Sequence, residues 1–288
     1  MKNKKILIFF SLYMVLIPWL SFAQNRNSGP DFPAHRIIGN LYYVGTYNLG
    51  VFLLASEEGH ILINTAYADS TPQIQASIES LGYSMDDVRI LLTQQAHFDH
   101  TGALAEIKQL TGAQMWATRN DARVLEDGGF SDPHNGGPES RFAFEPVEVD
   151  RILYDGDEIE LGGNRLVVHI HPGHTEGSSS YSMVVRENGR DYRVLIANMG
   201  TVNAGKRLAV DPTYPGVAAD FAYTFTNQKS MDLDIWIAPH PDQYNLHDKW
   251  QPGQAYNPET FVDPEGFLEA VDALENQFLE LLAEERID

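Results

Sequence analysis

The sequence predicts an α/β fold in which helices lie outside a two-sheet core. Short apolar or alternating segments, which are typical of strands, precede segments of helical periodicity, and this cycle occurs twice along the chain. No low-complexity stretch or clear linker separates the two cycles. We therefore expect one domain, which spans residues 24–288.

Residues 1–23 have the composition of a signal peptide. Three lysines at positions 2, 4 and 5 precede an almost unbroken apolar run, and Ser21 and Ala23 are small residues at the positions that a signal peptidase reads. The apolar run is short for a membrane span. We expect cleavage after Ala23, export to the periplasm and no membrane anchor afterwards.

Composition excludes several classes of site and partner. The chain has no cysteine, so it can form neither a disulfide nor a thiolate metal site, and no lipidated cysteine can tether it. Without the three leader lysines it has 40 acidic and 17 basic residues, a net charge of −23. Because this charge repels phosphate backbones, we expect no nucleic-acid partner.

The first cycle begins with strands at residues 41–44, 51–55 and 60–64. A helix follows, with Thr71 as its N-cap, Pro72 in its first turn and Gly82 after its end.

An apolar strand, a helix, a short strand and a second helix come next, at residues 88–93, 102–110, 115–117 and 118–128. Gly, Pro, Ser and Asn are frequent in residues 130–146, which predicts a surface loop near the mouth of a site.

The second cycle contains more strands, at residues 152–153, 158–161, 165–171, 178–186, 191–197 and 235–238. Asn188-Gly189 predicts a hairpin turn between the fourth and fifth of them. Helices are expected over residues 215–231 and from Asp263-Pro264 onward, where apolar residues recur at helical spacing.

The run QAHFDHTG at residues 95–102 carries the strongest chemical signal. Two imidazoles and a carboxylate fall within four positions, directly after a buried strand, where such dense polar groups serve no packing purpose. Imidazole nitrogen and carboxylate oxygen are usual zinc ligands. His174 and His240 also follow strands directly. Since strand ends gather at one rim of a sandwich, the three segments predict one metal centre.

These motifs resemble the metallo-β-lactamase superfamily, whose pattern is His-x-His-x-Asp-His, then Gly-His-Thr-x-Gly, then a late His. The resemblance extends from Leu41 to the final helix and is strongest at QAHFDHTGALAEIK and PGHTEGS. Among its branches, the chain is most similar to subclass B3 β-lactamases that have Gln in place of the first histidine. The resemblance implies an αββα sandwich, with two mixed sheets, helices on the outer faces and two zinc ions at the rim.

Carried over by motif, the resemblance implies two Zn²⁺ sites, the first formed by Gln95, His97 and His174 and the second by Asp99, His100 and His240. Because a neutral amide is a weaker donor than imidazole, we expect the first site to bind zinc less tightly. Asp99 would also orient the nucleophile.

The implied reaction is hydrolysis of the β-lactam amide of penicillins, cephalosporins and carbapenems by zinc-bound hydroxide, in a monomer. Thr201 is the nearest match for holding the substrate carboxylate, and Asn203 and Lys206 are weaker candidates. An ordinary loop role for Thr201 is the alternative. The remaining histidines that sequence places near a motif are His134, His169, His171 and His247, which are either structural or hydrogen-bonded beside the site.

Two other functions remain open. A lactone or thioester hydrolase of the same fold is one, although such enzymes usually have a metal-bridging Asp where this chain has Asn198. An exported zinc-binding or scaffold protein without activity is the other, because fold alone does not fix function.

Overall fold

A computed structural model describes Pro30 and residues 32–287. The expected signal peptide and its cleavage site lie outside these described residues. No helix in the described part is long and apolar enough to cross a membrane.

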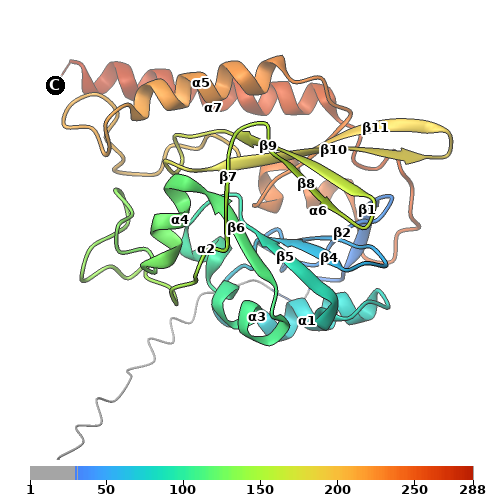
Figure 1. Cartoon of the computed structure of the whole chain (residues 1–288). Coiled ribbons are helices and arrows are strands. Elements are labelled where there is room, and N and C mark those ends of the chain that lie inside the picture. The colour runs from blue at the N-terminus through green and yellow to red at the C-terminus, as the bar shows by residue number, and fades with distance from the viewer. Residues whose placement is uncertain (1–29, 31, 288) are drawn as a thin grey trace, which may run out of the picture.

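The larger sheet has seven strands in chain order (Figure 1). They are β1 (His35–Ile38), β2 (Leu41–Tyr43), β3 (Phe52–Leu54), β4 (His60–Ile63), β5 (Val88–Leu92), β6 (Gln114–Thr118) and β7 (Arg151–Leu153). Strands β1 to β4 are antiparallel neighbours, whereas β4 to β7 pair in parallel.

The smaller sheet has five strands in the order β12-β11-β10-β9-β8. They are β8 (Glu158–Leu161), β9 (Asn164–Ile170), β10 (Ser179–Glu187), β11 (Arg190–Ile196) and β12 (Ile235–Ile237). Only the β11–β12 pair is parallel, so both sheets are mixed.

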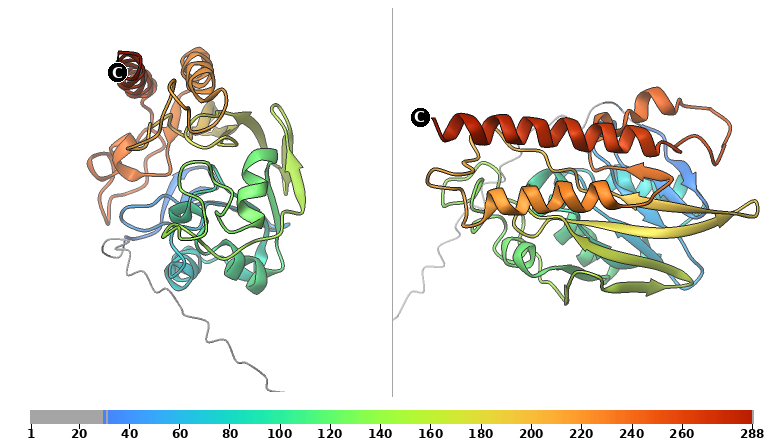
Figure 2. Two further views of the ribbon diagram at one scale, coloured as in Figure 1. Left: turned by 90° about the vertical axis from the view of Figure 1, so that its left-hand side faces the viewer. Right: turned by 90° about the horizontal axis from the view of Figure 1, so that it is seen from above.

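Helices cover the outer faces of the two sheets (Figures 1 and 2). The α-helices are α1 (Thr71–Ser80), α2 (Phe98–Thr101), α3 (Leu104–Thr111), α4 (Arg119–Glu126), α5 (Val217–Ser230), α6 (Leu246–Lys249) and α7 (Pro264–Glu285), and the 3₁₀ turns are η1 (Met85–Asp87) and η2 (Pro241–Tyr244). Helices α1 and α3 lie against the larger sheet, and α5 and α7 against the smaller one. This is the predicted sandwich of two sheets between helical layers.

Alternating side chains of β4 and β5 show how the layers pack. Ile63 and Leu92 belong to the core between the sheets, whereas Leu62 and Leu91 belong to the core beneath α1 and α3. Successive residues of a strand point to opposite faces, so these strands must be apolar on both. The uninterrupted apolar run in the sequence therefore reflects a doubly buried strand.

Local details differ from the sequence predictions. Ser70, not Thr71, occupies the N-cap position of α1. The helix predicted over residues 102–110 is α3, which begins two residues later, and the short helix α2 before it was not predicted. Between them Gly102 donates its N–H to the Ala66 carbonyl, and a Cβ there would lie 2.5 Å from the Ala68 nitrogen. Thr118 precedes α4, but its hydroxyl donates to the Gly177 carbonyl instead of capping the helix. Strand β1 was not predicted, since its four residues follow a polar lead-in directly.

Candidate metal centre

Three loops carry the candidate ligands, and they bring His97 to His174 and Asp99 and His100 to His240. The loop after β5 carries Gln95, His97 and the start of α2, the loop after β9 carries His174, and the loop after β12 carries His240. The first loop belongs to the larger sheet and the other two to the smaller sheet. The centre therefore bridges the two sheets at one rim.

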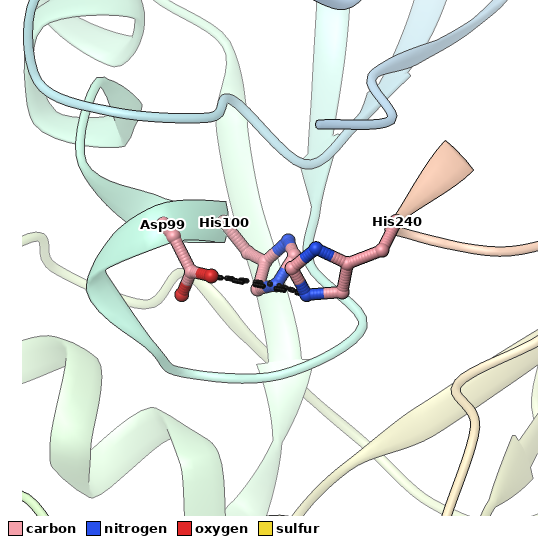
Figure 3. A group of neighbouring side chains, drawn as sticks. All are labelled: Asp99, His100 and His240. Atoms are coloured by element: carbon pink, nitrogen blue, oxygen red, sulfur yellow. Dashed lines mark hydrogen bonds and ion pairs between the residues drawn. The ribbon is translucent and has the colours of Figure 1, made fainter. Parts of the chain in front are cut away.

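Asp99, His100 and His240 form a cluster whose ligand atoms lie within 4.8 Å of one another (Figure 3). The Oδ2 atom of Asp99 lies 3.5 Å from Nε2 of His100 and 3.8 Å from Nε2 of His240, and the two nitrogens are 3.2 Å apart. The side chains point toward one another from α2 and from the loop after β12. We call these three residues the carboxylate trio.

His97 and His174 form a second contact, with Nδ1 of His97 3.2 Å from Nε2 of His174. Zinc–nitrogen bonds of about 2.0–2.1 Å in a tetrahedral site place two ligand nitrogens about 3.3 Å apart. The nitrogen separations in both clusters therefore fit two ligands of one ion. We call these two residues, together with Gln95 of the same loop as His97, the amide trio.

Gln95 supplies an independent test of whether the residues suit a cation. Its side chain is buried, and its Oε1 atom accepts no hydrogen bond from the described residues. Leaving a buried carbonyl oxygen without a partner costs about 1–3 kcal/mol. A cation bound by Gln95 would satisfy this oxygen, so the residue suits a role as an oxygen ligand beside two imidazoles.

The amide trio is held by groups that the sequence analysis missed or placed elsewhere. Oδ2 of Asp132, in the long loop, lies 3.3 Å from Nε2 of His97. Nδ1 of His174 lies 2.8 Å from the Thr201 carbonyl and 2.9 Å from its hydroxyl. Such contacts fix which ring nitrogen is free to bind a metal. Asp132 stands outside every motif, so no sequence pattern pointed to it.

Asp121 joins the first two ligand loops. This buried carboxylate, in the first turn of α4, accepts from the N–H groups of Ala96 and Gly177 and from the Thr175 hydroxyl. Burial raises its pKa to about 6, although these hydrogen bonds oppose the shift. Asp121 lies in the first turn of a predicted helix, where an acidic residue is ordinary, so nothing in the sequence pointed to this role.

Protonation within the clusters suits metal binding. Burial lowers the pKa of His100 to about 3 and lowers the pKa of His174 well below its usual value. Burial opposes ionisation of Asp99, but the neighbouring histidines hold its pKa below the ordinary value. Neutral imidazoles beside an ionised carboxylate are the state in which these groups bind zinc.

The other sequence candidates fall into two groups. Thr201 is partly exposed and contacts the His174 ring, and Asn203, two residues on, is also partly exposed. Lys206, the weaker candidate, is buried and its ammonium donates to main-chain carbonyls, which argues against contact with a substrate. His134 is partly buried; burial and the nearby Lys206 ammonium lower its pKa, and the Asp132 carboxylate opposes this shift.

His169, His171 and His247 have other partners. His169 is hydrogen-bonded to the Ser182 hydroxyl, and His247 to the Tyr47 carbonyl. His171 is hydrogen-bonded to the Ser180 hydroxyl and the Asn227 side-chain amide.

Asn198, at the end of β11, is fully buried, and neither Oδ1 nor Nδ2 has a hydrogen-bond partner among the described residues. A neutral amide at this position replaces the negative charge that a bridging carboxylate would bring.

The fold and the site define a metallohydrolase of the αββα class. The family model for the metallo-beta-lactamase superfamily matches residues 51–186. A β-lactamase from Chitinophaga pinensis is 44% identical with a TM-score of 0.87, and the match covers 92% of this chain and 99% of that one. The class B3 di-zinc metallo-β-lactamase LRA-12 from an Alaskan soil metagenome is 44% identical, with a TM-score of 0.85 and coverage of 90% and 97%.

The metallo-β-lactamase GOB-18 from Elizabethkingia meningoseptica is 42% identical with a TM-score of 0.84, over 88% of this chain and 93% of that one. A probable metallo-hydrolase from Burkholderia pseudomallei is 32% identical over 192 residues, and the chain spans 60% of the length of that relative. The chain belongs to the metallo-β-lactamase superfamily. Within it, the chain is a hydrolase of subclass B3.

Proposed function

We propose that the protein hydrolyses the amide bond of β-lactam antibiotics with zinc. The observation that carries this proposal is the convergence of the amide trio and the carboxylate trio at one rim. Support also comes from three β-lactamase structures that are 42–44% identical over nearly their whole length.

In this proposal, Gln95, His97 and His174 hold one zinc ion and Asp99, His100 and His240 hold the other. When bound, zinc polarises the substrate carbonyl and supplies hydroxide at neutral pH, because it lowers the pKa of water from about 16 to about 7.

The chain's own residues orient the reactants. The Asp99 carboxylate, 18% exposed, can accept a hydrogen bond from the attacking nucleophile while it binds the metal. Thr201 contacts His174 and Asn203 follows it on the same partly exposed segment, where both can donate to the substrate carboxylate. Substrates would include penicillins, cephalosporins and carbapenems.

A lactone or thioester hydrolase is the second candidate, because a hydroxyacylglutathione hydrolase from Rhodospirillum rubrum is 29% identical over 108 residues. The neutral Asn198 argues against it, since no carboxylate stands there to bridge two ions.

Hydrolysis of the chromogenic cephalosporin nitrocefin tests the proposal. We expect turnover that EDTA abolishes and added zinc restores. Stable zinc binding with turnover of a thioester or a lactone, but of no β-lactam, would favour the second candidate. Zinc binding without any turnover would leave a scaffold.

We further propose that the mature chain, residues 24–288, acts in the periplasm as a monomer. The leader composition motivates export, and the lack of cysteine leaves no residue for a lipid anchor. N-terminal sequencing of periplasmic protein, expected to begin at Gln24, and its mass in solution test this.

A further inference from the structure

Lys206 is a buried lysine whose ammonium is directed at main-chain carbonyls. It is 6% exposed, and its ammonium donates to the carbonyls of His174 at 2.7 Å and Gly173 at 3.1 Å. The rings of Tyr214 and Phe221 lie 5.8 and 6.0 Å from Nζ. Because burial disfavours the charged form, the pKa of Lys206 falls to about 8. Burying an ammonium group costs free energy, which these hydrogen bonds partly offset. The question is therefore what the contacts do for the segment that they hold.

The two carbonyls belong to the segment that carries a candidate metal ligand. Gly173 has φ +125°, and a Cβ there would lie 2.8 Å from the Phe221 ring. This conformation turns the chain sharply between β9 and His174. Two hydrogen bonds from one ammonium fix both carbonyls at that turn.

The loop that carries Lys206 also contacts the His174 ring, through Thr201. The Thr201 carbonyl is 2.8 Å from Nδ1 of the ring, five residues before Lys206. The main chain of His174 is thus bound by Lys206 and its ring by Thr201. Together the contacts direct Nε2 of His174 toward His97.

Helix α7 anchors this loop at a distance from the metal centre. The Glu285 carboxylate, in the last turn of α7, accepts from the N–H groups of Leu208 and Ala209 at 2.8–2.9 Å. These residues follow Lys206 closely in sequence. The C-terminal helix therefore restrains the segment that positions the lysine.

We propose that Lys206 is a positioning residue for the metal centre, which clamps the His174 backbone and is itself anchored by Glu285. This inference rests on the proposed assignment of His174 as a zinc ligand. Lys206 acts through His174 and contacts neither metal nor substrate in this scheme. Its donors matter, whereas its positive charge opposes a nearby cation.

Zinc affinity of the mature chain, measured by competition with a chromophoric chelator, tests the clamp. Lys206→Met removes the donors, and we expect zinc in the amide trio to bind about tenfold more weakly, the usual lower limit for groups that support a metal ligand. The carboxylate trio should keep its affinity. Lys206→Gln keeps a donor and should restore most of the loss. The absorption bands of cobalt-loaded protein should shift in Lys206→Met and return in Lys206→Gln.

Two further variants guard against a trivial loss of folding. Glu285→Gln lies outside the centre and should weaken the same zinc by about threefold, a fraction of the effect on a direct support. Lys108→Met is the matched control, since Lys108 also donates to a main-chain carbonyl, that of Glu148, in a loop without candidate ligands. It should leave both affinities unchanged.

Equal or tighter zinc binding in Lys206→Met would overturn the clamp. If the parent binds two zinc ions but hydrolyses no β-lactam, the proposed function fails while these affinity differences still decide the role of Lys206.

Discussion

The two halves of the metal centre are built in opposite ways. The carboxylate trio contains a charged candidate ligand, Asp99, and its His240 side chain is 32% exposed. The amide trio has no charged ligand and its residues are buried, but Asp132 and Thr201 hold its imidazoles and Lys206 holds its backbone. By contrast, Nδ1 of His100 has no partner among the described residues.

This difference separates two sources of metal affinity. In the proposed carboxylate trio, metal affinity would depend on the charge of Asp99. In the amide trio, a neutral oxygen contributes less, so the preset positions of two imidazoles must contribute more. Substitutions at ligands should therefore affect the first half most, and substitutions around ligands should affect the second half most.

Removing Asp99 should have the largest effect. Asp99→Ala deletes both a ligand and the group that orients the nucleophile, so we expect nitrocefin turnover to fall at least about 1,000-fold. Zinc analysis after dialysis should show loss from the carboxylate trio. Substitution of the exposed Glu139 by Gln is the control. A loss of tenfold or less would mean that Asp99 serves neither role.

Acid should also weaken the fold through His35, a histidine that lies outside both halves of the metal centre. Burial lowers the pKa of His35 to about 4, with partial opposition from the Pro33 carbonyl. Between about 6.5 and 4 the unfolded chain binds more protons, so stability present above pH 6.5 is lost as pH falls, by about 3 kcal/mol.

Urea unfolding of the zinc-free protein at pH 7 and pH 4 measures this loss. His35→Phe preserves a ring against Trp250, whose centroid lies 3.8 Å from that of His35, and should reduce the difference between the two pH values. His171, whose pKa is also about 4, should retain its part. An unchanged difference in His35→Phe would exclude His35 as a source.

Asp132→Asn should weaken zinc in the amide trio by about tenfold, because the charged partner of His97 Nε2 is lost. Competition titrations should show no change in the carboxylate trio. Glu139→Gln, in the same loop, again serves as control. Equal weakening at both halves would mean that the loop acts on the whole rim.

Gln95→His should have the smallest and opposite effect. Imidazole replaces an amide oxygen, so we expect the amide trio to bind zinc about fivefold more tightly. The parent should lose zinc from this trio first during dialysis. Full and equal occupancy of both halves in the parent would contradict the expected weakness.

The sequence predicted the fold and the converging groups because both have local signatures. Apolar runs, Asn188-Gly189 and Asp263-Pro264 predicted elements that the structure contains, and the Asp263 side chain caps the last helix by accepting from the Gly266 N–H. The supports could not be predicted in this way. Asp121 and Asp132 act on residues up to 56 positions away, through contacts that only the packed layers create.

Lys206 is a residue that the sequence did single out, but for a role that its surroundings do not support. The family resemblance made it a weaker candidate for the substrate carboxylate, but it is buried and its ammonium donates to the carbonyls of Gly173 and His174. A charge in a loop does not reveal whether it faces solvent or the chain.

The rim joins loops from both sheets, so a cation held there would act as a crosslink between the two layers. The chain has no cysteine and hence no covalent crosslink of its own. A ligand present at 100 times its dissociation constant stabilises a folded protein by about 2.7 kcal/mol. Chelation should therefore lower the midpoint temperature of thermal unfolding. Scarcity of zinc would shorten the lifetime of the folded protein as well as remove its proposed activity.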